Sequence, residues 1–299
     1  MNSELNHHPL SGATDIDSAA SIIWSFYKKN FVALFTISFI ISLISQLLMK
    51  SGDIMSIQSA TTPDEMIQAF NKIYPTLILM VIVTLVLNLF LAWFIALYPL
   101  KGIKSVGESF TGTAKSFLPF IVITIIFAFL GIIAIIVGTF ALIVGAFFAM
   151  VYLVLIFSLL SPVIVLEDQN IGETMSRVFS LANRRFWPTM GWTTLLILIL
   201  LVASFLLSAI ILIPFTGNFV KAILDPAASS AMVEISANPL FVILSSIAEA
   251  VTKPLLLLMG FTIYFSSTES GKNLITDNKE TGSGPKVEDL YSGSNDKGE

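Results

Sequence analysis

The chain contains no cysteine and only two histidines among its 299 residues. The absence of cysteine excludes disulfides, thiolate metal sites and cysteine nucleophiles. His7 and His8 lie in a polar N-terminal segment, where a solvated pair is expected rather than a metal site, so no imidazole is predicted within the apolar part of the chain. Catalytic triads, H-E-x-x-H zinc sites and glycine-rich phosphate loops are also absent. The sequence therefore predicts a protein that is not an enzyme and uses no metal or cofactor.

Charged residues are scarce as well, at 12% of the chain, while 55% of residues are hydrophobic and the mean hydropathy is +0.87. Soluble domains carry about 25% charged residues, so this composition predicts an all-α integral membrane protein. The net charge of −4 includes the acids of a polar C-terminal segment and does not indicate a nucleic-acid partner. We expect membrane lipids as partners, with a membrane-protein partner or a homo-oligomer left open.

Six apolar segments are long enough to cross a bilayer, which takes about 20 residues per helix. The run from Leu118 to Leu166 holds 166 − 118 + 1 = 49 uncharged residues. As one helix it would reach about 74 Å, so we predict a turn near Gly138 and Thr139. No cleavage site follows the first run, which we interpret as an uncleaved span. The predicted spans are about 31–49, 76–100, 118–137, 140–166, 190–214 and 240–265.

Basic residues are distributed unequally between the two sets of loops that these spans create. One set contains eight: Lys28, Lys29, Lys101, Lys104, Lys115, Arg177, Arg184 and Arg185. The opposite set contains three: Lys50, Lys72 and Lys221. The positive-inside rule then places both termini in the cytoplasm. We predict a membrane domain at 16–266 between disordered tails at 1–15 and 267–299, because the tails are polar and poor in aliphatic residues.

A short pattern recurs before the spans. "IDSAASIIWSFYKKNF" (Ile16 to Phe31) and "IGETMSRVFSLANRRF" (Ile171 to Phe186) share Ile, two Ser and Phe at the same offsets, and Val106 to Phe117 is a shortened third copy. We interpret each copy as an amphipathic interfacial helix on the cytoplasmic leaflet, giving three hairpins that are each preceded by such a helix. The alternative, that basic-ended amphipathic segments simply resemble one another, stays open. The predicted lipid-facing residues are Trp24, Lys28, Lys29, Arg184, Arg185 and Trp187.

Two other groups of residues are notable. Small residues recur around the predicted turn from Gly131 to Ala149, which favours a tight hairpin over a pore-lining stripe. Glu167, Asp168 and Glu173 cluster after the fourth span, where we expect helix-capping acids rather than a divalent-cation site.

The last predicted span contains Glu249 and Lys253, one helical turn apart. Charges at membrane depth are costly, and Glu four residues before Lys is the favourable order for a helical ion pair. We interpret the two as an intramembrane polar pair that neutralises itself. The alternative is a substrate or proton site.

The stretch "SPVIVLEDQNIGETMSRVFSLANRRFWPTMGW" (Ser161 to Trp192) resembles a bacterial six-span family. That family is similar to the membrane domain of some glycerophosphodiester phosphodiesterases. Their catalysis belongs to a separate soluble barrel that this chain has no room for, so the resemblance implies no enzyme. The resulting hypothesis is a non-enzymatic protein of the bacterial inner membrane that organises lipid or partner proteins. The alternative is a small transporter, channel or lipid-translocating protein that uses Glu249 and Lys253.

Overall fold

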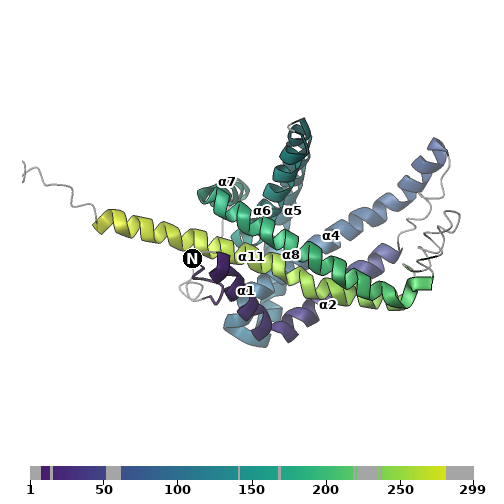
Figure 1. Cartoon of the computed structure of the whole chain (residues 1–299), viewed down its shortest axis with the longest axis horizontal. Coiled ribbons are helices and arrows are strands. Elements are labelled where there is room, and N and C mark those ends of the chain that lie inside the picture. Colours follow the sequence, from purple (N-terminus) through teal and green to yellow (C-terminus); the bar gives the residue numbers. More distant parts are fainter. Residues whose placement is uncertain are drawn as a thin grey trace, which may run out of the picture.

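The structure is a computed structural model that describes residues 8–13, 16–51, 62–140, 142–167, 170–217, 220, 235 and 238–280. Its regular elements within these ranges are helices, and no strand occurs there (Figure 1). The long elements are α2 (Phe31–Ser51), α4 (Pro63–Lys101), α5 (Ser105–Phe140), α6 (Leu142–Leu166), α8 (Phe186–Leu212) and α11 (Pro239–Glu280). The short elements are α1 (Ile16–Lys29), α7 (Ile171–Arg184) and the 3₁₀ turns η2 (Gly102–Lys104) and η3 (Ile213–Phe215). The all-α prediction is confirmed.

Within the described ranges, five segments are long and apolar enough to cross a membrane. One of them, Pro63–Phe140, comprises both α4 and α5, because only η2 separates the two helices. Gly102 makes this turn possible with φ +58°, a left-handed conformation that a side chain disfavours. The structure therefore supports a membrane-embedded helical protein, and the count of six spans stays a prediction.

The α5–α6 hairpin is tight, as the small residues predict. α5 ends at Phe140 and α6 begins at Leu142, just after the expected turn. A Cβ atom on Gly138 would lie 2.8 Å from the carbonyl oxygen of Gly145, and one on Gly131 would lie 2.7 Å from the Leu153 side chain. A side chain at Gly138 would therefore displace the backbone of α6, whereas one at Gly131 would require the Leu153 side chain to move.

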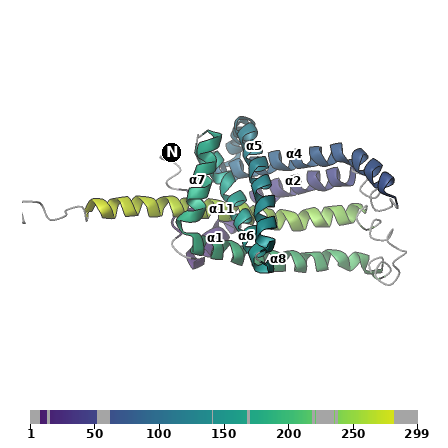
Figure 2. The ribbon, with the colours of Figure 1, turned by 90° about the horizontal axis from the view of Figure 1, so that it is seen from above.

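The helices converge at one end of the molecule and diverge at the other. Figure 1 shows the α5–α6 hairpin pointing away from α2, α4, α8 and α11, and Figure 2 shows those four running in a common direction. We call the convergent end, where α1 and α7 lie, the elbow end. The buried core gathers there and includes Ile95, Leu155, Leu159, Leu258 and Phe261. The far halves of α5 and α8 instead expose side chains such as Phe129, Ile136, Leu201 and Phe205, as expected of helix faces that contact lipid.

One predicted interfacial helix is continuous with a span in the structure. The segment Val106 to Phe117 forms the first third of α5 rather than a separate interfacial helix, and Pro119 lies inside the same helix. α4 also begins before the predicted span of 76–100, at Pro63, and continues through Pro75. Thr62 caps α4 through a capping box with Glu65.

The chain ends also differ from the predicted disordered tails. In the described part of the N-terminal tail, His8 and Leu10 are fully buried in the core. At the other end, α11 continues without a break through Glu280, beyond the predicted boundary at residue 266. The rest of both predicted tails, residues 1–7, 14–15 and 281–299, lies outside the described residues.

Candidate functional site

α1 is attached to the bundle by its inner face and leaves its outer face free. Phe26 and Tyr27 are buried, and the Tyr27 hydroxyl donates to the carbonyl oxygen of Val251 in α11 at 2.9 Å. Burial raises the pKa of Tyr27, so its hydroxyl remains a proton donor. On the outer face, Trp24 is 55% exposed, and the Lys28 Nζ lies 5.6 Å from the centre of the Trp24 ring. The indole and its cation therefore lie on the protein surface, and their contact with lipid stays a prediction.

α7 repeats this arrangement before α8. We call each junction between a short amphipathic helix and the long helix that follows it, α1 with α2 and α7 with α8, an elbow. Asn170 and Glu173 form a capping box at its start, so Glu173 is a capping acid as predicted. At the other end of α7, the Arg184 Nη1 donates to the carbonyl oxygen of Ser267 in α11 at 2.9 Å. Arg185 is the single residue between α7 and α8, and Trp187, which follows in α8, is 71% exposed. Arg184 therefore fastens the elbow to α11, while Arg185 and Trp187 lie on the surface.

Glu167 has a different role from the capping acid that the sequence predicts. The single Arg177 Nε–H is shared between both oxygens of its carboxylate, at 3.0 and 3.2 Å, and the Tyr264 hydroxyl donates to Oε1 at 2.8 Å. These contacts tie the end of α6 to α7 and α11. The sequence gives no signal for the Tyr264 contact, because the two residues are far apart in the chain. Asp168 lies outside the described residues, and within the described ranges no group of three or more potential metal ligands occurs.

The ion pair predicted in the last span is present. The Lys253 Nζ lies 2.9 Å from the Glu249 Oε1, with side-chain exposures of 12% for Lys253 and 37% for Glu249. Val251, which accepts from Tyr27, lies between the two charged residues in sequence. The pair is therefore level with the C-terminal end of α1. Ser246, one turn earlier, is fully buried and donates to the carbonyl oxygen of Val242.

His8 is a core residue that the sequence reasoning missed, and its prediction as a solvated histidine is wrong. Its ring stacks on Phe265 at a centroid distance of 5.1 Å and lies near Phe26 at 5.8 Å. The Nε2 atom is 3.3 Å from the carbonyl oxygen of Ile95, and the Nδ1 atom accepts from the backbone N–H of Leu10. Burial lowers the pKa of His8 to about 4, which keeps the imidazole neutral near pH 7. A neutral histidine thus holds the N-terminal segment against the bundle.

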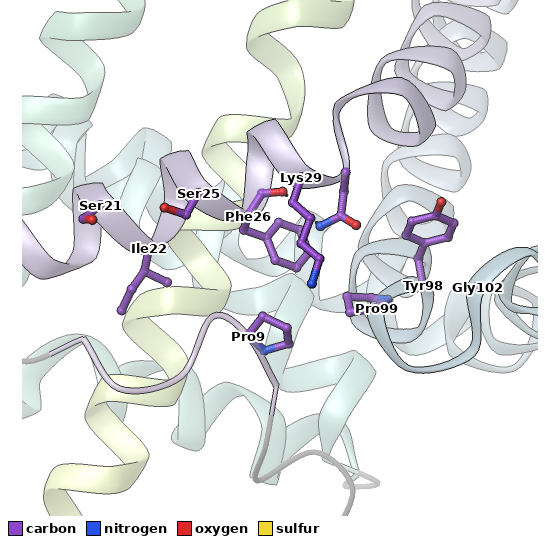
Figure 3. A pocket seen from close by; sticks show the side chains of 10 residues that line it. Pro9, Ser21, Ile22, Ser25, Phe26, Lys29, Tyr98, Pro99 and Gly102 are labelled. Carbon is purple, nitrogen blue, oxygen red and sulfur yellow. Dashed lines mark hydrogen bonds between the residues drawn. The ribbon is translucent and has the colours of Figure 1, made fainter.

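A pocket of about 460 Å³ opens between this N-terminal segment, α1 and the end of α4 (Figure 3). Its polar side chains are Ser21, Ser25, Lys29, Asn30 and Tyr98. Pro9, Ile22, Phe26, Pro99 and Gly102 complete the lining. The sequence predicts Lys29 as a lipid-facing residue and gives no sign of a pocket beside it. The pocket forms because the burial of His8 brings Pro9 to α1, and no local sequence pattern indicates that burial.

Comparisons of the chain with protein-family models, curated proteins and solved structures found no match. The resemblance of Ser161 to Trp192 to the bacterial six-span family therefore stays a prediction. The features of the described structure that bear on function are the elbows, the pocket and the ion pair.

Proposed function

We propose that this protein is a non-enzymatic, multi-span protein of a bacterial inner membrane that organises anionic lipid at the cytoplasmic leaflet. The observation that carries this proposal is the pair of elbows. At each elbow a short amphipathic helix ends in basic residues, leads directly into an apolar helix, and has an exposed tryptophan close by, Trp24 at α1 and Trp187 at the start of α8.

The two kinds of side chain act on different parts of a lipid leaflet. Tryptophan favours the headgroup region, because its ring is apolar and its N–H is polar. A basic residue close to an anionic surface contributes about 1 kcal/mol of attraction. Lys28, Lys29 and Arg185 are exposed at the elbows, so together they supply about 3 kcal/mol toward anionic over neutral lipid. In this orientation both chain ends lie in the cytoplasm.

The composition of the lipid shell around the purified protein tests the proposal. The triple variant Lys28→Gln, Lys29→Gln and Arg185→Gln removes three charges from the elbows but leaves the Arg184 contact with α11 intact. It should carry less phosphatidylglycerol relative to phosphatidylethanolamine when it is extracted in native nanodiscs.

The matched control is Lys50→Gln, Lys72→Gln and Lys221→Gln, which removes the same charge from the loops predicted to face the other side. The control should keep the lipid ratio of the parent protein. Equal ratios in the parent and both triple variants would contradict the proposed function.

The second candidate function is transport or lipid translocation through a site at Glu249 and Lys253. The observation in its favour is the partial exposure of the Glu249 side chain, which leaves one face of the pair accessible. Against it, the two charges lie 2.9 Å apart and neutralise each other. Transport predicts that the charge-free double variant Glu249→Gln and Lys253→Met folds normally but loses activity in a cell-based complementation assay.

A further inference from the structure

We propose that the pocket between α1, the N-terminal segment and the end of α4 binds the phosphate of an anionic phospholipid headgroup, with Lys29 as its cation. This inference rests on the proposed function, because a lipid can reach the pocket only if α1 lies at the leaflet surface. It goes further by assigning one site and one ligand chemistry to one of the two elbows.

The donors of the pocket are arranged along one face of α1. Ser21, Ser25 and Lys29 follow one another at four-residue intervals, which places them in a row on the helix surface. Tyr98 lines the pocket from α4, on the other side of Lys29 from Ser21 and Ser25 in Figure 3. Three hydroxyl groups and one ammonium group are suitable donors to the oxygens of a phosphate. Among the described residues that line the pocket, none is acidic, so no carboxylate there competes for Lys29.

Among the charges around the pocket, that of Lys29 determines whether the pocket attracts an anion. α1 and α4 end near it, which adds partial negative charge, whereas α2 begins near it, which adds partial positive charge. These helix-end effects oppose one another. Lys101, on the last turn of α4, is paired with Glu108 at 2.5 Å. Lys28 is directed onto Trp24 instead.

At the second elbow, the same Ser–Ser–basic pattern contributes to packing within the protein. In the alignment of the two segments, Ser176, Ser180 and Arg184 of α7 occupy the offsets of Ser21, Ser25 and Lys29. Arg184 donates to a backbone carbonyl of α11, so its cation serves the protein's own packing. In α1 the corresponding cation lines an open pocket. The two elbows therefore share a pattern, but Lys29 lines the pocket whereas Arg184 contacts the backbone of α11.

The surroundings favour a lipid over a free phosphate ion. The volume of about 460 Å³ lies in the usual range for small-molecule sites and exceeds what a single phosphate fills. At the same elbow, α2 begins with Phe31 and Val32, which are 39% and 77% exposed. These apolar side chains offer a surface for acyl chains next to a site for the headgroup. A free phosphate would leave them unused.

The test measures binding of phosphatidylglycerol and phosphatidylcholine to the full chain by native mass spectrometry. Lys29→Gln is compared with Lys28→Gln, because both variants remove one charge from the same helical turn. Lys29→Gln should weaken phosphatidylglycerol binding about tenfold more than Lys28→Gln, as expected for loss of a charge-assisted hydrogen bond. Ser21→Ala with Ser25→Ala should weaken it by roughly fivefold. Phosphatidylcholine binding should not change, and unchanged thermal unfolding confirms that each variant folds.

Other outcomes separate the site from the function. Equal losses in Lys28→Gln and Lys29→Gln would overturn the pocket assignment, while anionic-lipid enrichment around the protein would still support the proposed function. No preference for phosphatidylglycerol in the parent protein would contradict both. A third arm titrates inorganic phosphate: if it displaces bound phosphatidylglycerol at micromolar concentration, the pocket prefers a soluble anion and the lipid assignment fails.

Discussion

Acidification should release the N-terminal segment from the bundle, because the segment depends on a neutral His8. The folded-state pKa of His8, about 4, lies below the unfolded value of 6.5, because burial disfavours the charged ring. Between these two values the detached segment binds more protons than the docked segment. The contribution of His8 to docking is therefore complete above pH 6.5 and is lost as the pH falls toward 4.

The size of this effect follows from the two pKa values. The difference of 6.5 − 4 = 2.5 units corresponds to roughly 3 kcal/mol at 1.36 kcal/mol per unit. A change of this size is comparable with the roughly 1.5–3 kcal/mol that burial of one side chain such as Leu10 contributes, so it can offset the packing of the segment. Most of the response should therefore be local detachment of residues 8–13 rather than unfolding of the helices.

The absence of native cysteine allows a specific assay. Ser11→Cys places a single environment-sensitive fluorophore on the segment, and its emission is followed from pH 7.5 to 4. The emission should shift toward that of a solvated dye across this range. His8→Phe keeps a ring that can stack on Phe265 but cannot titrate, so its emission should stay constant. A pH response that is identical in the parent and in His8→Phe would refute the reasoning.

The remaining predictions concern the helix contacts, and thermal unfolding in detergent measures each of them. Gly260→Ala would place a Cβ in steric conflict with the backbone carbonyl oxygen of Ser158 in α6 and should lower the free energy of unfolding by about 2 kcal/mol or more. Gly191→Ala, whose Cβ would meet nothing within 4 Å, should be neutral, and equal stabilities of the two variants would contradict the close packing of α6 and α11. Glu249→Gln or Lys253→Met alone should lower the free energy of unfolding by about 1–2 kcal/mol, because each single change leaves one partly buried charge unpaired. The double variant should recover most of this stability, and additive losses would show that the two residues are uncoupled. Arg177→Met should lower the free energy of unfolding by about 2 kcal/mol, because it leaves the Glu167 carboxylate, which is 12% exposed, without its cation. An unchanged midpoint of thermal unfolding would contradict this prediction.

The features that the sequence predicts well are those that arise within one helix. The apolar runs, the hairpin turn near Gly138, the capping box of Glu173 and the Glu249–Lys253 pair all depend on residues a few positions apart. Helical periodicity and residue type decide such features directly. Their agreement with the structure is therefore expected.

The features that the sequence does not predict depend on contacts between distant segments. His8 is polar in a polar neighbourhood, and only the stacking with Phe26 and Phe265 makes its burial favourable. Glu167 directly follows a span, which is a position typical of a capping acid, but its carboxylate accepts hydrogen bonds from Arg177 and Tyr264. The pocket at Lys29 likewise needs Pro9 to be held against α1. In each case the deciding contact is tertiary and leaves no local pattern.

The position of the elbow helices relative to the leaflet tests the central claim most directly, because both the proposed function and the pocket assignment depend on it. Spin labels at Trp24→Cys and Trp187→Cys, in bilayers that contain phosphatidylglycerol, report depth through their accessibility to oxygen and to a water-soluble nickel complex. We expect both labels at the headgroup level, with intermediate accessibility to the two reagents. Full accessibility to the nickel complex at both positions would show that the elbows lie in water and would contradict the account.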